Sequence, residues 1–243
     1  MYSLFLAIQF LTILNLRIKE AEPLKMARSM VYFPVVGLLI GLFLCGINAG
    51  LSIFNFSPIA TNTILLIALI IITGGMHLDG LSDAIDALFS GKTKEEMLEI
   101  MRDPRVGVMG VLSLIVIILL KIGLLSSLNP ALKTTALLLM CTLSRWSAVL
   151  EIFLFPYARK EGKARIFIQG ITPEIFILST GIVVVLAFMI WQLKGLLLVV
   201  TIATATAFFG KFICDRIGGI TGDTLGATIE ITEAIILFGV SIS

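Results

Sequence analysis

Residues 73–107 read TGGMHLDGLSDAIDALFSGKTKEEMLEIMRDPRVG and lie between two long apolar segments. This stretch holds the only histidine, and Asp79, Asp83 and Asp86 recur in it at positions i, i+4 and i+7. On an α-helix these positions share one face. Three carboxylates on one face repel one another unless a cation lies between them, and hard oxygen ligands suit magnesium. The spacing therefore predicts a helix that presents a Mg²⁺ site.

The composition of the whole chain is that of a membrane protein. Of its 243 residues, 58% are hydrophobic and 14% are charged, and the mean hydropathy is +1.08. Soluble domains have about half apolar and about a quarter charged residues. We therefore expect an all-α, polytopic helical bundle in the lipid bilayer, with about six to seven membrane helices. The net charge of +2 gives no indication of a nucleic-acid partner.

Apolar runs mark the expected spans along the chain. They lie at residues 31–53, 63–76, 106–126, 132–153, 175–193, 195–213 and 226–243. A membrane helix needs about 20 residues, so the last run is only marginally long enough. Residues 2–16 are shorter still and read as a tilted or half-inserted helix. Because no linker or internal repeat interrupts the pattern, residues 1–243 are expected to form a single membrane-embedded domain.

Charged residues are distributed unevenly over this topology. Most lysines and arginines fall on one side of the membrane, and the positive-inside rule makes that side cytoplasmic. Aspartates and glutamates gather on the same side, although acids do not set orientation. A functional site at the cytoplasmic face of the cell membrane explains their segregation.

A second motif, GGITGDTLG at residues 218–226, precedes Glu230 in the last apolar run. Glycine N–H groups at the start of a helix can bind phosphate. The candidate phosphate contacts are Gly219, Thr221 and Gly222. Glycines also permit close packing between membrane helices, which is the alternative explanation. Glu230 is a functional candidate because of its depth in the membrane, unless it lies in the headgroup region.

Three arginines are candidates for binding an anionic substrate. Arg102 and Arg105 flank an Asp-Pro pair directly after the acidic motif, where they could clamp phosphate oxygens. Arg145 falls inside an apolar segment, where a charge costs at least about 2.5 kcal/mol unless it faces water or a partner. Arg159, Lys160, Lys163 and Arg165 in the loop at 156–173 belong to the same basic group, but membrane orientation explains most of their charge.

His77 has several roles open to it: a general base, a phosphate contact or a structural donor. The alternative for the acidic motif is that Asp79 caps a helix and the other aspartates are solvated. We favour the metal, because three unneutralised carboxylates on one face are costly. Together the residues indicate metal-dependent transfer of a phosphate-containing group within a membrane.

Four segments resemble those of the cobalamin synthase family, whose members are also called adenosylcobinamide-GDP ribazoletransferases or cobalamin-5′-phosphate synthases. The segments are GGMHLDGLSDAIDAL, EIMRDPRVGVMGVLSLIVIILLK, LSRW and GGITGDTLGATIEITE. The resemblance runs from residue 32 to the end of the chain, with the motifs in the family's order. Ser82 stands where a small residue such as alanine is expected.

The resemblance implies a magnesium-dependent membrane transferase of late cobalamin biosynthesis. Such an enzyme joins adenosylcobinamide-GDP to α-ribazole or α-ribazole 5′-phosphate, releases GMP and yields adenosylcobalamin or its 5′-phosphate. Carried onto this chain, the implied metal ligands are Asp79, Asp83, Asp86, Asp223 and Glu230. The catalytic candidates are His77, Asp79, Asp83 and Asp86. The substrate-binding candidates are Arg102, Arg105, Arg145, Gly219, Thr221 and Gly222.

Two other functions are weighed against this resemblance. A CDP-alcohol phosphotransferase also places aspartates on membrane helices, but its DGxxAR signature is not reproduced after Asp79. An ion-coupled transporter should place ionisable residues near the bilayer midplane, on broken helices of two related halves. The sequence leaves open whether the protein forms a homo-oligomer. It also leaves open which base the nucleotide acceptor carries and whether the acceptor bears a 5′-phosphate.

Overall fold

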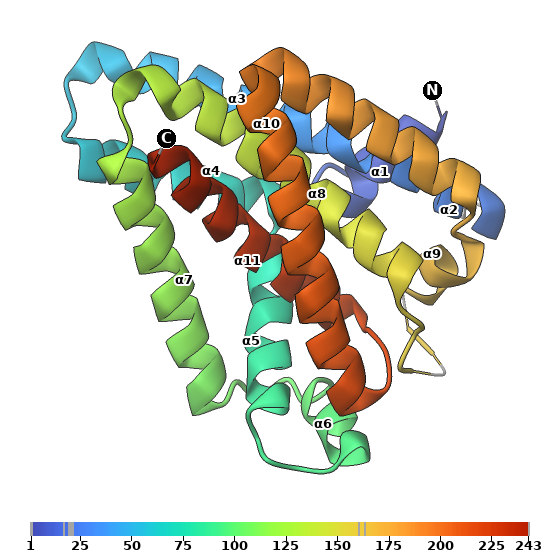
Figure 1. Cartoon of the computed structure of the whole chain (residues 1–243). Coiled ribbons are helices and arrows are strands. Elements are labelled where there is room, and N and C mark those ends of the chain that lie inside the picture. Colours follow the sequence, from blue (N-terminus) through green and yellow to red (C-terminus); the bar gives the residue numbers. More distant parts are fainter. Residues whose placement is uncertain (1, 17, 19–21, 160, 163, 243) are drawn as a thin grey trace.

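The structure is a computed structural model that describes residues 2–16, 18, 22–159, 161–162 and 164–242. Within these residues it contains eleven α-helices and three short 3-10 helices. The only β-type pairing in the same residues is an isolated bridge between Tyr157 and Ile220. The expectation of an all-helical chain is therefore confirmed (Figure 1).

The helices follow one another in short steps along the chain. The α-helices are α1 (Tyr2–Leu11), α2 (Pro23–Ser29), α3 (Phe33–Leu51), α4 (Pro58–Thr73), α5 (Met76–Leu88), α6 (Lys94–Ile100), α7 (Val108–Ser127), α8 (Lys133–Leu154), α9 (Arg165–Gly170), α10 (Pro173–Ile217) and α11 (Gly222–Ser241). The 3-10 helices are η1 (Met30–Tyr32), η2 (Ser52–Phe54) and η3 (Pro130–Leu132).

Five of the described helical segments are long and apolar enough to cross a membrane, or six if α4 and α5 count as one bent span. This agrees with the predicted polytopic membrane bundle. Helix α10 accounts for two of the expected spans, because its helical geometry breaks at Trp191 and Gln192. Figure 1 shows the chain turning back at this break, so that α10 forms two arms.

Helices α4 and α5 are separated by a sharp turn of 89°. Gly74 ends α4 with a φ of 65°, and Gly75 begins α5 with a φ of 69°. Two successive left-handed residues are readily tolerated only by glycine. The turn redirects the chain, so that α5 packs against α7 and α11.

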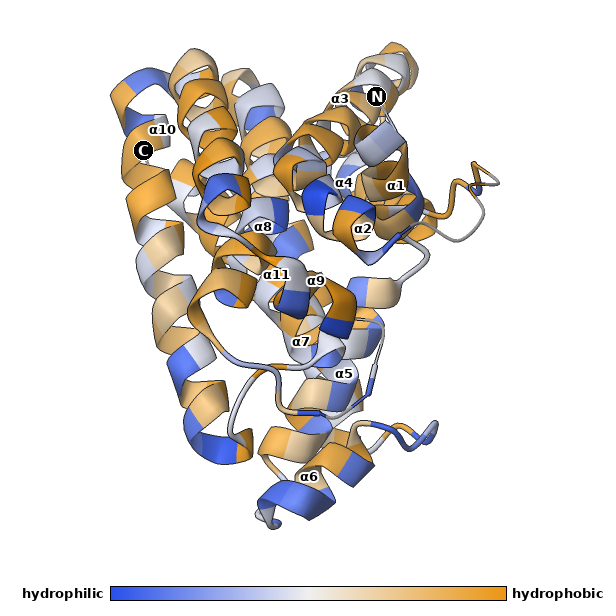
Figure 2. Cartoon of the chain, turned by 90° about the vertical axis from the view of Figure 1, so that its right-hand side faces the viewer, coloured by the Kyte–Doolittle hydropathy of each residue, from blue (hydrophilic) through white to orange (hydrophobic). Residues whose placement is uncertain are grey.

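Helix α8 is the centre of the bundle, with α3, α10 and α11 packed around it. In the most apolar part of its segment 83% of the residues are buried, compared with 22% in α7. Helix α7 is therefore peripheral and presents most of its apolar surface outward, as a lipid-facing helix does. Figure 2 shows that hydrophilic residues gather around α6 and its adjoining loops, at one end of the long helices.

At the contact between α3 and α8, adding a single methyl group should strongly lower the stability of the protein. A Cβ at Gly37 would overlap the main-chain carbonyl of Cys141, whereas a Cβ at Gly46 of the same helix would meet nothing within 4 Å. We expect Gly37→Ala to lower the free energy of unfolding by about 1–3 kcal/mol through overpacking. Gly46→Ala should not lower it, because the added methyl group is unobstructed and alanine is the better helix former. Thermal unfolding in detergent compares the two, and equal melting temperatures would contradict the packing.

Candidate functional site

The two sequence motifs meet where α5 packs against the start of α11. A Cβ added at Gly80 would lie 2.8 Å from the carbonyl oxygen of Asp223. One added at Gly226 would lie 3.1 Å from the carbonyl oxygen of His77. The two backbones can approach this closely only because both positions are glycine. The glycines of the second motif therefore bring Asp223 next to the acidic face of α5.

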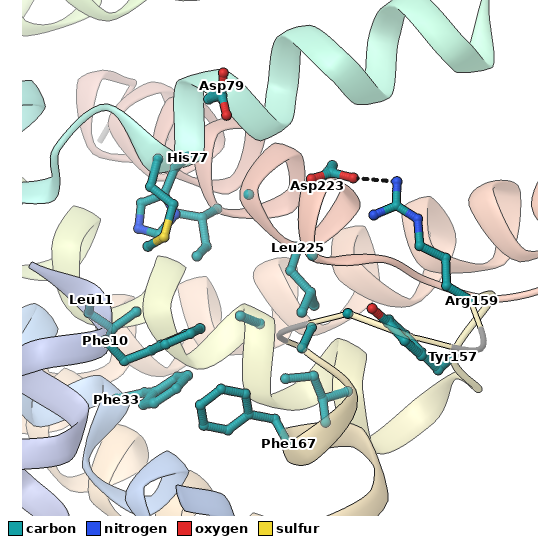
Figure 3. Close-up of a pocket in the computed structure, with 18 residues that line it drawn as sticks. Phe10, Leu11, Phe33, His77, Asp79, Tyr157, Arg159, Phe167, Asp223 and Leu225 are labelled. Carbon is teal, nitrogen blue, oxygen red and sulfur yellow. Dashed lines mark hydrogen bonds and ion pairs between the residues drawn. The ribbon is translucent and has the colours of Figure 1, made fainter. Parts of the chain in front are cut away.

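A cavity of about 300 Å³ lies beside this contact. His77 and Asp79 of α5 border it together with Asp223 of α11, as Figure 3 shows. The loop after α8 contributes Tyr157 and Arg159. The opposite wall is apolar and comes from α1, α3 and α9, through Phe10, Leu11, Phe33 and Phe167.

Asp79 and Asp83 have no hydrogen-bond or ion-pair partner among the described residues. The electrostatic neighbours of Asp83 are three repelling carboxylates, those of Asp79, Asp223 and Asp86, and the attracting guanidinium of Arg159. This is the accumulation of negative charge that the spacing predicts. An incoming cation is the physical means of relieving it.

Asp86 has a different environment from the other two aspartates of the motif. Its carboxylate accepts hydrogen bonds from the main-chain nitrogens of Gly107 (2.6 Å) and Gly110 (2.7 Å). These groups belong to the start of α7, where a carboxylate stabilises the unpaired N–H groups and the helix dipole. A Cβ at either glycine would collide with this carboxylate. Asp86 therefore anchors α7, and its expected roles as a metal ligand and catalytic residue stay predictions.

Glu230 and Arg145 also lie elsewhere than expected, in a buried network of four charges. Lys121 Nζ is 2.5 Å from a carboxylate oxygen of both Glu230 and Glu233. Arg145 pairs with the second oxygen of Glu233 and donates to Ser144 Oγ. Buried charges persist only when they are paired, and two cations here neutralise two anions. Glu230 and Arg145 therefore help to hold the bundle together and do not border the cavity, and their expected roles in metal and substrate binding stay predictions.

Some residues of the glycine-rich turn at 218–226 shape the fold, and others border the cavity. The Thr221 hydroxyl accepts from the main-chain nitrogen of Thr224, and the Thr224 hydroxyl accepts from that of Thr221, which closes the N-terminus of α11. Gly219 lies against the main chain of residues 156–158. Of the three expected phosphate contacts in this turn, only Gly222 borders the cavity. Gly219 and Thr221 instead form the turn that directs α11 toward α5.

The basic groups at the cavity differ in part from those the sequence indicates. Arg105 is exposed and donates to Asp103, which lowers the pKa of that carboxyl group to about 2. Arg159 was not predicted, because orientation explained its loop, yet its Nη2 lies 2.7 Å from Asp223 Oδ2 at the cavity. Burial raises the pKa of Tyr157, and the positive charges of Arg159 and Arg102 oppose that rise. Neither Arg102 nor Arg105 lines the cavity, and Arg105 is paired with Asp103.

The donor set suits a metal ion only in part. The described residues contain no group of three or more His, Cys, Asp or Glu side chains that could hold an ion by themselves. Magnesium is commonly bound through one or two carboxylates, with water and substrate phosphates as the remaining ligands. The unpartnered carboxylates of Asp79 and Asp83 fit that mode. Magnesium binding here stays a prediction.

A polytopic helical bundle with an acidic and arginine-lined cavity is the architecture of a membrane-embedded enzyme. A sequence model of the cobalamin-5-phosphate synthase family matches residues 3–241. This chain belongs to that family.

Similar proteins carry the name adenosylcobinamide-GDP ribazoletransferase. That of Desulforamulus reducens is 38% identical over 97% of this chain and 94% of its own length. That of a Roseiflexus species is 36% identical over 98% and 88%. That of Fusobacterium nucleatum is 35% identical over 98% and 96%. No solved structure matches the chain significantly.

Substitution of Asp83 and of Asp86 on α5 by alanine is expected to affect stability differently. Asp86→Ala should lower the free energy of unfolding by about 0.5–2 kcal/mol, the usual cost of losing a helix cap. Asp83→Ala should cause no loss, because it removes a repelled carboxylate that has no partner among the described residues. Thermal unfolding of both variants in detergent tests this difference, and a destabilised Asp83→Ala protein would refute it.

The buried network predicts a strong effect of removing one of its cations. Lys121→Met would leave Glu230 and Glu233 with a single positive partner, and we expect a loss of about 3–5 kcal/mol. Adding Glu230→Gln to the Lys121→Met variant should restore part of the lost stability. Lys211→Met is the matched control, because Lys211 forms an exposed pair with Asp215 and should change stability by at most about 1 kcal/mol. Similar losses in Lys121→Met and Lys211→Met would contradict the network.

Proposed function

We propose that this protein is an adenosylcobinamide-GDP ribazoletransferase. It joins adenosylcobinamide-GDP to α-ribazole or α-ribazole 5′-phosphate, releases GMP and forms adenosylcobalamin or its 5′-phosphate. The observation that carries the proposal is the meeting of the two family motifs at one cavity, with Asp79, Asp223 and Arg159 along its wall. The names of the similar proteins support the choice of substrates.

The reaction requires one bond to form and one to break at the same phosphorus atom. A ribose hydroxyl of the acceptor forms a bond to the cobinamide-linked phosphorus and gives up its proton. The bond from that phosphorus to the oxygen of GMP breaks, and GMP leaves with the electron pair. Negative charge builds up on the diphosphate, so positioning and charge neutralisation dominate catalysis.

Residues at and beside the cavity would bind the metal ion and the phosphate oxygens. Asp79 and Asp83 would hold Mg²⁺ against the diphosphate, and the ion when bound would neutralise phosphate oxygens and stabilise the leaving group. Arg159 can exchange its bond with Asp223 for bonds to phosphate, because a guanidinium has five donors. The free N–H groups in the first turn of α11, beginning with Gly222, favour an anion at the same place.

His77 is the candidate for accepting the proton of the attacking hydroxyl. Its side chain is 4% exposed, and its Nε2 atom has no hydrogen-bond partner among the described residues. In a loose phosphoryl-type transfer a strong base contributes less than charge neutralisation. We therefore rank Asp79 above His77 in its contribution to the rate.

The site is proposed to face the cytoplasm, at the cell membrane. The basic loops beside it support this orientation through the positive-inside rule. Helix α5 lies beside α6, at the hydrophilic end of the long helices (Figure 2). A nucleotide-linked substrate would reach the cavity from that side.

Turnover in liposomes tests the function and the aspartate site together. With adenosylcobinamide-GDP, α-ribazole or its phosphate, and Mg²⁺, we expect GMP and the corrinoid product in equal amounts. EDTA should abolish both. Asp79→Ala or Asp83→Ala should lower turnover by about 10²–10³-fold, the usual cost of losing charge stabilisation in a transition state. His77→Ala should cost less.

Asp215→Ala is the control for these variants, because Asp215 is exposed on α10 and paired with Lys211. It should retain wild-type turnover. Absence of product with either acceptor, in protein that melts cooperatively, would refute the function. Full turnover in EDTA or in Asp83→Ala would instead refute the proposed metal site and leave the transferase reaction standing.

A further inference from the structure

The cavity beside α5 and α11 has two chemically different ends. Asp79, Asp223 and Arg159 give one wall its charge. The rest is lined by aromatic and aliphatic side chains, including Phe10, Phe33 and Phe167, which Figure 3 shows on the side opposite Asp79 and Asp223. A ligand that fills this space must be apolar at one end and polar or anionic at the other.

The three phenylalanines form a built aromatic wall. The ring centroids of Phe10 and Phe33 are 5.7 Å apart, and those of Phe10 and Phe167 are 4.5 Å apart. Phe33 and Phe167 meet edge to face at 5.7 Å. The rings come from α1, α3 and α9, and each fixes the orientation of the others. Phe33 and Phe167 are 2% and 1% exposed, so the wall offers the cavity ring edges and apolar surface with no hydrogen-bonding group.

Size excludes most of the donor substrate from this space. The volume of about 300 Å³ is at the lower limit of small-molecule sites, which range over about 300–1,000 Å³. A corrin ring with its side chains is several times larger than a nucleoside. The cavity can therefore take a nucleoside, or one nucleoside portion of a larger molecule.

The polarity of the wall distinguishes between the two nucleosides of the reaction. Guanine carries several donors and acceptors on its edge, and burial against phenylalanines would leave them unpaired at a large cost. A benzimidazole-type base has an apolar edge and one unsubstituted ring nitrogen. His77 borders the cavity, and its buried Nε2 has no hydrogen-bond partner among the described residues, so a small rotation of the ring would supply a single polar contact of that kind.

We propose that this cavity is the acceptor site, which binds the nucleoside α-ribazole with its base on the wall of Phe10, Phe33 and Phe167. Its ribose then lies at the end formed by Asp79, Asp223 and Arg159, where the hydroxyl meets the diphosphate. The corrinoid donor stays outside the cavity and presents only its diphosphate to that end. The inference rests on the proposed ribazoletransferase function and adds the location of one of its substrates.

Variants of the apolar wall test the proposal. Ala148 of α8 borders the cavity and is 3% exposed, so Ala148→Leu would fill the space, while Phe167→Leu would remove an aromatic face. Both should raise KM for α-ribazole by about tenfold or more and leave KM for adenosylcobinamide-GDP unchanged. Phe153→Leu is the matched control, because the Phe153 ring stacks on Phe176 outside the cavity.

Equilibrium dialysis of α-ribazole against the full chain in detergent, without donor, separates this inference from the proposed function. We expect binding to wild type and Phe153→Leu, and weaker binding to both cavity variants. Wild-type turnover with unchanged acceptor KM in variants that melt like wild type would overturn the acceptor site alone and point to a lipid or detergent chain in the cavity. A rise in donor KM instead would also overturn it and assign the space to guanosine. Binding of α-ribazole without turnover would support the site and overturn the function.

Discussion

The contact between α5 and the first turn of α11 is the constraint on which the rest of the site depends. Gly80 lies against the main chain of Asp223, and Gly226 lies against that of His77. No side chain separates the two backbones, so carboxylates from distant parts of the sequence share one face of a cavity. The left-handed Gly74 and Gly75 make this possible, because they turn α5 away from α4 and toward α11.

Charge is arranged in two ways within this bundle. Lys121, Arg145, Glu230 and Glu233 are buried and mutually neutralised, as membrane depth requires. Asp79 and Asp83 lack partners among the described residues; Asp79 borders the cavity, and Asp83 lies one turn further along the same helix. The first arrangement stabilises the fold and the second leaves negative charge for a ligand to neutralise.

The cavity joins two kinds of chemistry in a small space. Its charged end suits phosphate transfer, and its aromatic wall suits a base that is poor in hydrogen-bonding groups. Under the proposal above, the smaller nucleoside occupies the enclosed site, and the larger corrinoid approaches from the hydrophilic end of the molecule with its diphosphate foremost.

The sequence by itself determined the all-helical membrane fold, the two motifs and the family, because hydropathy and helical periodicity are local properties. It also indicated that Asp79, Asp83 and Asp223 belong together. Only the tertiary structure decided that Asp86 holds α7 and that Glu230 and Arg145 belong to a buried network. The aromatic wall was equally invisible in the sequence, and the basic loop that contains Arg159 was visible there but explained mostly by membrane orientation. The partner of a buried or capping charge is set by helices distant in sequence, and spacing along one helix carries no information about them.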